Sequence, residues 1–454
     1  MNKNFALASA LAVIAASWAG TTWYSSQHIE GHYQQTIERF NRHTLSPVTL
    51  KLTSFKRGFL HSRANWEVNL TLDPCQPNNS MVLTGYDEIT HGFIPSLGWA
   101  SIHSHIIWPD VVETPLKQVF ASKEPLSIRS RVNFLGNLRT HISSPAFNWQ
   151  NELMQVNWKG LQGSINFSEN NEQLSFKVQV PGLTVQAKNS NTQQLVLSDL
   201  RYQGSQRVEQ SLLPLGKTEF LIKNIQVGSQ NNLWRFKNVL LGSKNQLNRG
   251  MLSANMNYQI DNIDFNQQSV GNFQANVVLE HLSEQAVQEA YQRIGLLQRQ
   301  CNPPTQAILQ AFAPIFKQGF QLRLNQAELQ LFKGSAQANA LVLLPAMSQP
   351  EQQSVEQILN QMSASGRLQV SEQLIKGVFE HISQQKGEAM SPAEAEQMLR
   401  MITQNMLEQG YLTKTATGYQ LSFALNQGQA SVNGQPLHRE SLGSSAFNPE
   451  RQGQ

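Results

Sequence analysis

Two histidines one residue apart, His103 and His105, are the residues in this 454-residue sequence whose types and spacing could most directly do chemistry. Residues i and i+2 of a β-strand point to the same face, so both imidazole rings could bind one metal ion. No glutamate or third histidine follows at a fixed short spacing, and the apolar run Ile106–Trp108 comes next. We therefore expect a half-buried pair of strand residues, with no metal and no cofactor. A metal-dependent hydrolase that uses these histidines is the least favoured of three hypotheses.

The other reactive side chains lack the sequence context of a catalytic site. His91 precedes Gly92 in an expected turn, so we predict a hydrogen-bonded loop histidine and not a general base. Ser62 follows His61, but no G-x-S-x-G nucleophile elbow surrounds it. A Walker A loop and a glycine-rich dinucleotide fingerprint are also missing from the sequence. We therefore predict no catalytic residues and no enzymatic activity.

The charge of the chain argues against nucleic acid as a partner. The formal net charge is +4, and charged residues make up 15% of the sequence, against roughly 25% in typical soluble domains. Basic residues are scattered and form no dense run of the kind that follows phosphates. Lys56 and Arg57 are expected to stay solvated, with a contact to anionic lipid as the alternative for Arg57.

The beginning of the chain indicates export. The run Phe5–Tyr24 carries no charge and is long enough to cross a bilayer as a helix. Lys3 precedes it and Trp23 and Tyr24 end it, which favours a cytoplasmic N-terminus and an aromatic belt on the far side. We predict that residues 1–26 form an uncleaved signal anchor and transmembrane helix. A signal peptide cleaved after Ala19 is the alternative.

The hydrophobic periodicity then changes twice along the chain. Residues 27–45 show helical spacing and are predicted to form a membrane-proximal helix. Over residues 46–278, short runs of alternating apolar and polar residues are separated by turns, which is typical of antiparallel strands. Residues 279–439 mix helices with strands of the same assembly, and the polar residues 440–454 are predicted to be a disordered tail. The predicted fold class is α+β: a transmembrane helix, a large antiparallel β-meander sheet, and helices packed in the C-terminal half.

Several segments of the C-terminal half have the periodicity and end signals of helices. The last of these begins with Ser391-Pro392-Ala393-Glu394, a capping box with proline in the first turn. The predicted helices cover residues 282–298, 304–318, 351–362, 372–385 and 392–408.

The chain contains two cysteines, Cys75 and Cys301, each in a segment rich in proline and asparagine. An even count in an exported domain favours a bridge, because the compartment is oxidising. We predict a Cys75–Cys301 disulfide. Two unpaired cysteines that pack as small apolar groups are the alternative.

The stretch from Phe55 to Val68, FKRGFLHSRANWEV, resembles the opening of the bacterial YdgA-like family, whose function is unknown. The motif residues carried by this sequence are Arg57, Gly58, Ser62, His91, Gly92, Asn433 and Gly434. Phe93 stands where that family usually has proline. The resemblance covers nearly the whole chain and implies an envelope protein anchored in the inner membrane, with its bulk in the periplasm and no established reaction. The motif residues are those of turns and strands, and Gly58 is predicted to form the corner that leads into the sheet.

These observations lead to a ranked set of functions. The favoured one is a non-catalytic, inner-membrane-anchored periplasmic envelope protein whose curved sheet binds a lipid or another apolar ligand. The alternative is a protein-interaction or dimerisation scaffold, with a homodimer as the simplest form. A long apolar groove would favour the first, and a closed core with a flat apolar patch would favour the second.

Overall fold

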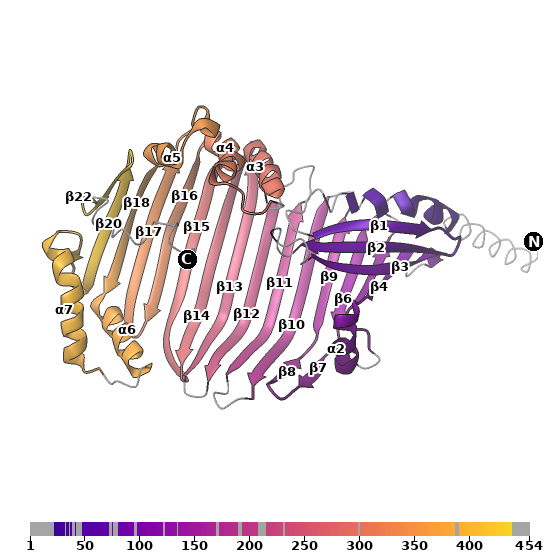
Figure 1. Ribbon diagram of the computed structural model, residues 1–454, viewed down its shortest axis with the longest axis horizontal. Coiled ribbons are helices and arrows are strands. Elements are labelled where there is room, and N and C mark those ends of the chain that lie inside the picture. The colour runs from indigo at the N-terminus through magenta and orange to yellow at the C-terminus, as the bar shows by residue number, and fades with distance from the viewer. Residues whose placement is uncertain are drawn as a thin grey trace, which may run out of the picture. The chain divides into compact units, whose positions relative to one another are not determined.

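The protein is described here by a computed structural model. It describes residues 22–31, 33–35, 37–38, 41, 48–71, 75, 80–94, 98–120, 123–133, 135–168, 172–188, 193–207, 215–229, 232–297, 300–385 and 390–437. The chain forms two compact units (Figure 1). The N-terminal unit comprises residues 1–222 and 291–304, and the C-terminal unit comprises residues 223–290 and 305–454. Strand β12 (Leu215–Ser229) contains the boundary between them.

The N-terminal unit is an antiparallel meander, as the alternating pattern predicts. Each strand from β1 to β6 pairs with the next, β6 then pairs with β9, and β9, β10 and β11 follow in order. The β7–β8 hairpin pairs with the second half of β10. The strands are β1 (Val48–Lys56), β2 (His61–Thr71), β3 (Ser80–Ile94), β4 (Gly98–Ile107), β5 (Ser127–Val132), β6 (Leu138–Ser144), β7 (Phe147–Gln150), β8 (Met154–Trp158), β9 (Leu161–Ser168), β10 (Gln173–Ala187) and β11 (Gln194–Arg207).

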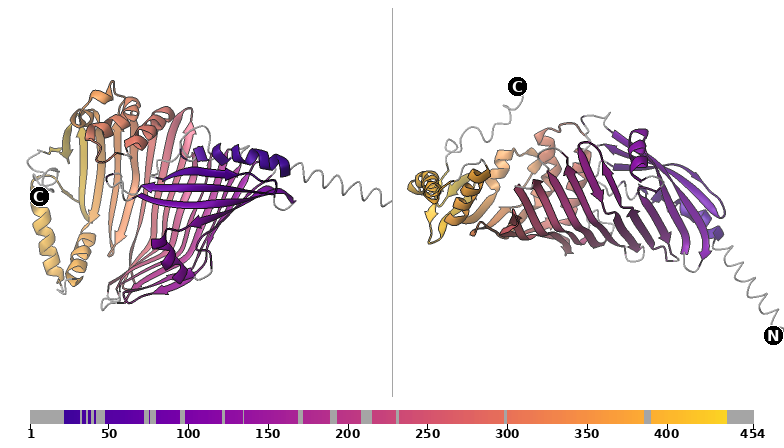
Figure 2. Two further views of the ribbon diagram at one scale, coloured as in Figure 1. Left: turned by 45° about the vertical axis from the view of Figure 1, so that its right-hand side comes forward. Right: turned by 90° about the horizontal axis from the view of Figure 1, so that it is seen from below.

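The sheet of this unit is strongly twisted. In Figures 1 and 2, β1, β2 and β3 run at a steep angle to β9, β10 and β11, because the right-handed twist between neighbouring strands accumulates along the meander. A helix that the sequence did not predict, α2 (Asp110–Phe120), interrupts the meander between β4 and β5. Its Phe120 packs edge-on against Phe147 of β7, and this aromatic contact holds the helix in place.

A helix precedes the first strand. The described residues 22–31, 33–35, 37–38 and 41 are helical, in the region where the periodicity predicts a membrane-proximal helix. Most of the predicted transmembrane segment Phe5–Tyr24 lies outside the described residues, as does the predicted tail 440–454. Among the helices that are described, none combines the length and apolar character that crossing a bilayer requires.

The C-terminal unit is also built from antiparallel strands joined in a meander. Strands β13 to β18 pair in sequence order, β18 pairs with β20, and β21 and β22 complete the edge. These strands are β13 (Asn232–Asn248), β14 (Met251–Phe265), β15 (Gln268–Ser283), β16 (Phe320–Leu331), β17 (Gly334–Leu344), β18 (Ser363–Ser371), β19 (Thr413–Lys414), β20 (Gly418–Asn426), β21 (Gln429–Val432) and β22 (Gln435–Pro436).

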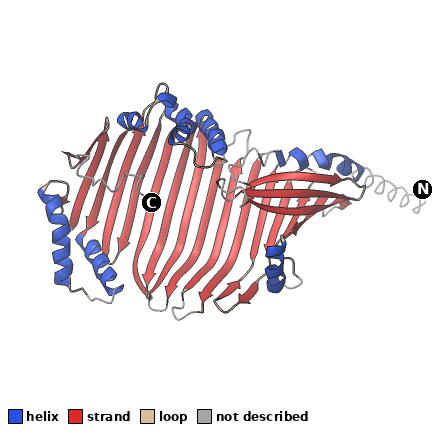
Figure 3. Ribbon diagram, viewed as in Figure 1, coloured by secondary structure: helices blue, strands red, loops and turns tan. Residues whose placement is uncertain are grey.

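The helices of the C-terminal half confirm the predictions closely. They are α3 (Glu284–Leu297), α4 (Thr305–Gln318), α5 (Val355–Gln361), α6 (Glu372–Gln385) and α7 (Pro392–Glu408), with a short 3₁₀ turn η2 (Pro350–Gln352). The predicted capping box of α7 is present, because the Ser391 side chain accepts a hydrogen bond from the Glu394 backbone and the Glu394 side chain accepts one in return. Figure 3 shows that α4 and α5 lie at one end of the strands of this unit and α6 at the other.

Aromatic packing seats α6 on the sheet of the C-terminal unit. The His381 ring lies among those of Phe265, Phe332 and Trp234, at centroid distances of 4.3, 5.1 and 5.3 Å. Burial lowers the pKa of His381, which keeps the ring neutral among its aromatic neighbours. The predicted turn at Asn433-Gly434 connects β21 to β22, and both residues have positive φ (49° and 81°), as a tight hairpin turn requires.

Candidate functional sites in the N-terminal unit

Two residues of the opening motif, Gly58 and Ser62, form a hydrogen-bonded network with Ser25 and His91, which we call the N-terminal clasp. His91 contacts the hydroxyl of Ser62 through Nε2 (2.7 Å) and that of Ser25 through Nδ1 (3.1 Å). The Gly58 amide donates to the Ser62 hydroxyl at 3.2 Å. Ser25 belongs to the N-terminal helix, so the clasp fastens that helix to strands β2 and β3.

Two of the motif residues lie elsewhere than predicted. His91 and Gly92 lie inside β3 and not in a turn. The pairing of β3 with β4 shifts register between His91 and Ile94, and Gly92 has a φ of 132°. A β-bulge therefore replaces the expected turn, since glycine tolerates this backbone conformation. Gly58 does lie at the predicted corner between β1 and β2, although the bulge in that strand pair is between Leu52 and Ser54.

The hydrogen bond between Ser62 and His91 is the one that a catalytic serine makes with its general base, but the surroundings of this pair differ from those of a catalytic site. Both residues are buried, with 4% of each exposed, so no substrate reaches the hydroxyl. The second ring nitrogen of His91 meets the hydroxyl of Ser25, where a catalytic histidine is oriented by an acidic or amide group. The geometry supports the expectation of a satisfied histidine with a structural role.

Further contacts hold the same helix. Tyr33 donates a hydrogen bond of 2.5 Å to the buried carboxylate of Asp87, whose other oxygen accepts one from Trp66 at 2.9 Å. Burial, followed by the charge of Asp87, raises the pKa of Tyr33, so the phenol stays protonated. Arg57 stays exposed, as expected from the sequence, and it also forms an ion pair of 2.7 Å with Glu30 of the helix.

We expect the clasp to weaken in mild acid. Desolvation, and secondly the nearby His61, lower the pKa of His91 below its ordinary value of 6.5. The unfolded chain therefore takes up the proton first, and stability decreases as the pH falls below about 6.5. Denaturant titrations between pH 7.5 and 5 should show this decrease, and it should be smaller in His91→Gln. An equal decrease in both proteins would assign it to other groups.

The histidine pair acquires a third partner that the sequence did not reveal. His103 and His105 lie on β4, with ring centroids 4.1 Å apart, and Glu124 follows α2. The Glu124 carboxylate lies 3.4 Å from His103 Nε2 and 3.8 Å from His105 Nδ1. On its other side, His105 Nε2 lies 3.7 Å from the carboxylate of Glu88 on β3. The cluster depends on helix α2, which was not predicted, because this helix brings the chain back so that Glu124 lies beside β4.

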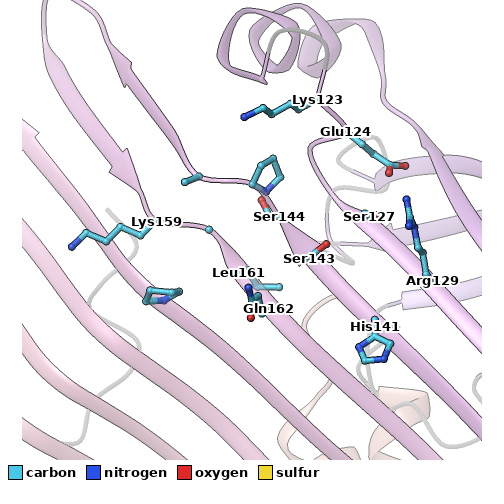
Figure 4. Close-up of a pocket in the computed structure, with 14 residues that line it drawn as sticks. Lys123, Glu124, Ser127, Arg129, His141, Ser143, Ser144, Lys159, Leu161 and Gln162 are labelled. Carbon is cyan, nitrogen blue, oxygen red and sulfur yellow. The ribbon is translucent and has the colours of Figure 1, made fainter.

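A pocket of about 680 Å³ opens beside Glu124 on the polar face of the sheet. Figure 4 shows Lys123, Glu124 and Arg129 around its rim, with the guanidinium end of Arg129 pointing toward Glu124. His141 of β6 lines the pocket from a neighbouring strand. The lining is mixed in charge, so the pocket suits polar groups and not an acyl chain.

The opposite face of the same sheet carries a surface that we call the apolar band. Cross-strand partners share a face, and on five neighbouring strands most of them are aliphatic or aromatic here, for example Ile128–Ile142 and Val178–Tyr202. Tyr202 is 40% exposed and the others are half-buried. The band consists of Ile128, Val132, Leu138, Ile142, Ile165, Phe167, Leu174, Phe176, Val178 and Tyr202.

The burial of this face changes along the sheet. Where the N-terminal helix covers it, Ala64, Ile89 and Ala100 are at most 2% exposed, packed under Ile29 and Tyr33. The face continues from β4 into the apolar band, where no side chain of the band is fully buried. Amphipathic alternation predicted one apolar face, but not which part of it a helix would cover.

The predicted disulfide is present. Cys75, between β2 and β3, is bonded to Cys301, between α3 and α4, with Cα atoms 4.5 Å apart and a sequence separation of 226. Both cysteines are exposed. The bridge fastens residues 291–304 to the other part of the N-terminal unit.

Comparison with known proteins supports the resemblance noted in the sequence. The family model described as "Bacterial protein of unknown function (DUF945)" matches residues 1–440. Protein YdgA of Escherichia coli (strain K12) is 21% identical over 343 residues, which cover 68% of this chain and 64% of the relative. The match thus spans less than two thirds of that relative's length. No solved structure is similar to the chain at a significant level.

Proposed function

The chain belongs to this family of bacterial proteins of unknown function, and from that premise we propose that it is a non-catalytic envelope protein that binds lipid acyl chains on the apolar band. The apolar band is the observation that carries the proposal. A partly exposed apolar surface that continues across five strands differs from the scattered apolar side chains of an ordinary soluble surface, and contiguous apolar surfaces mark binding sites.

The chemistry of the band favours an acyl chain over a polar ligand. The two hydroxyls in its middle, of Ser130 and Thr140, are hydrogen-bonded to each other at 2.8 Å and need no partner from a ligand. Gly163 and Gly204 interrupt the rows of side chains, and the Phe176 ring lies over the space beside Gly204. The surface therefore offers shape and apolar contact, which is what a hydrocarbon chain can use.

The cellular location is part of the same proposal. The uncharged run Phe5–Tyr24 would anchor the chain in the inner membrane with the N-terminus in the cytoplasm, and the bulk of the chain would face the periplasm close to a lipid surface. N-terminal sequencing of the native protein tests the anchor. A mature chain that begins at Gly20 would replace the anchor with a cleaved signal peptide.

A charge placed in the band is expected to abolish lipid binding. Val178→Asp puts a carboxylate into the apolar contact, where an unpaired charge is strongly disfavoured, so the affinity for a fluorescent fatty acid should fall more than tenfold. Ser175→Asp is the matched control, because Ser175 lies on the same strand but on the opposite face. Equal binding by both variants and the wild type would exclude the band as the site.

Native mass spectrometry of the purified chain separates lipid binding from the scaffold alternative. Co-purified species of lipid mass that disappear in Val178→Asp would support the proposal. A lipid-free dimer that dissociates in the same variant would show instead that a second copy covers the band.

A further inference from the structure

Three side chains at the end of β4 converge as metal ligands do. His103 and His105 share one strand face, and the Glu124 carboxylate approaches both rings, with oxygen–nitrogen distances of 3.4 and 3.8 Å. The candidate ligand atoms of the three residues all lie within 4.8 Å of one another. These distances exceed those of well-formed hydrogen bonds, so direct bonding does not account for the convergence.

The ring nitrogens in this cluster lack hydrogen-bond partners within the described part of the chain. Nε2 of His103 and Nε2 of His105 are both inaccessible to solvent and without a hydrogen bond. A buried polar atom without a partner costs about 1–3 kcal/mol, and native proteins contain few of them. A metal ion bonded to Nε2 of His103 would remove this cost for that atom.

We propose that His103, His105 and Glu124 bind a zinc ion. Zinc takes imidazole and carboxylate ligands at about 2.0–2.2 Å in a tetrahedron, so neighbouring ligand atoms lie roughly 3.3–3.5 Å apart. The 3.4 and 3.8 Å distances run to different oxygens of Glu124, and the ligand atoms of the three residues lie within 4.8 Å of one another, so side-chain rotations would have to draw them together around the ion. Two imidazoles and one carboxylate leave the fourth position for water or a ligand.

The surroundings supply the outer contacts of such a site. With Nδ1 of His105 on the metal, its Nε2 faces the Glu88 carboxylate 3.7 Å away, and a small rotation that shortens this distance would form the contact that orients metal-bound histidines. The Tyr86 ring stacks on His105 at 4.8 Å and limits its rotation, while Arg63 lies over the other side of Tyr86. Arg129 points toward Glu124 and opposes the cation, so it should weaken binding (Figure 4).

Zinc titration of the full-length, EDTA-treated chain tests the site, with calorimetry for affinity and elemental analysis for stoichiometry. One zinc per chain is expected. His103→Ala and His105→Ala should each weaken binding at least 100-fold, and Glu88→Gln about 10- to 100-fold. Removing the opposing charge with Arg129→Gln should tighten it. His141→Ala is the matched control, because His141 lies across the strands on the same face and outside the cluster.

Thermal unfolding with and without zinc distinguishes a variant that has lost the metal site from one that folds poorly. Zinc should raise the melting temperature of the wild type and of His141→Ala, since a ligand of the native state stabilises it, but not that of His103→Ala. Cobalt(II) should give the visible absorption of a tetrahedral site in the same proteins. The proposal would be overturned if His103→Ala bound zinc as tightly as the wild type. It would also be overturned if His141→Ala lost as much zinc affinity as His103→Ala, or if the wild type took up no stoichiometric zinc.

Discussion

Removing the disulfide, by Cys75→Ser together with Cys301→Ser, should lower the free energy of unfolding by up to about 5 kcal/mol. The bridge closes a loop with a sequence separation of 226 residues, and the entropy of the unfolded chain that it removes grows with loop length. The figure is an upper bound, because residual structure in the unfolded chain already restricts the loop. Denaturant unfolding of the oxidised wild type and the double variant measures the difference.

Reduction provides the control for this prediction. Dithiothreitol should destabilise the wild type to the level of the double variant and leave the variant unchanged. Thiol titration of the denatured, unreduced wild type should find no free thiol, and two after reduction, because the chain contains two cysteines. Two free thiols before reduction, or equal stability of both proteins, would contradict a stabilising bridge.

Adding one methyl group at the corner of the clasp should also have a large effect. A Cβ atom on Gly58 would lie 2.1 Å from the backbone oxygen of His61, and backbone cannot rotate away as a side chain can. Gly58→Ala must therefore open the turn, which breaks the hydrogen bond from its amide to Ser62. We expect a loss of roughly 1–3 kcal/mol, the usual cost of forcing an atom into a packed site. The reason is this close contact and not an unusual backbone angle.

Gly31→Ala is the matched control. Gly31 lies in the N-terminal helix, and a Cβ atom there would meet nothing within 4 Å. Alanine also favours a helix by up to about 1 kcal/mol over glycine, so this variant should be as stable as the wild type or more so. Limited proteolysis should cut the N-terminal helix faster in Gly58→Ala than in Gly31→Ala. Equal rates and equal melting temperatures would show that the corner tolerates a side chain.

The N-terminal unit is held together by two separate sets of contacts. The clasp holds the helix that follows the predicted anchor, and the disulfide holds residues 291–304. Three of the residues on which the family resemblance rests, Gly58, Ser62 and His91, belong to the clasp. Their contacts give the glycine, the serine and the histidine of the motif a structural role.

Local sequence patterns were enough to predict most of the helices and strands. Strand alternation and helical spacing depend on neighbouring residues, so the meander and the helices α6 and α7 could be predicted from the sequence. Helix α2 was not predicted, because its short segment lies between strands and contains Pro115, although Asp110 and Glu113 in its first turn and Lys117 in its last are helix end signals. The disulfide followed from the count of cysteines and the expected compartment, not from geometry.

The fold class, the amphipathic faces of the strands and the family of the chain follow from local patterns and motifs. Which distant residues meet depends on the three-dimensional path of the chain. That path placed Glu124 beside His103, and Ser25 beside His91, across separations of 21 and 66 residues that no periodicity encodes. The physical reason is that alternation specifies the face on which a side chain lies, whereas strand register and the path of the connecting segments specify its neighbours.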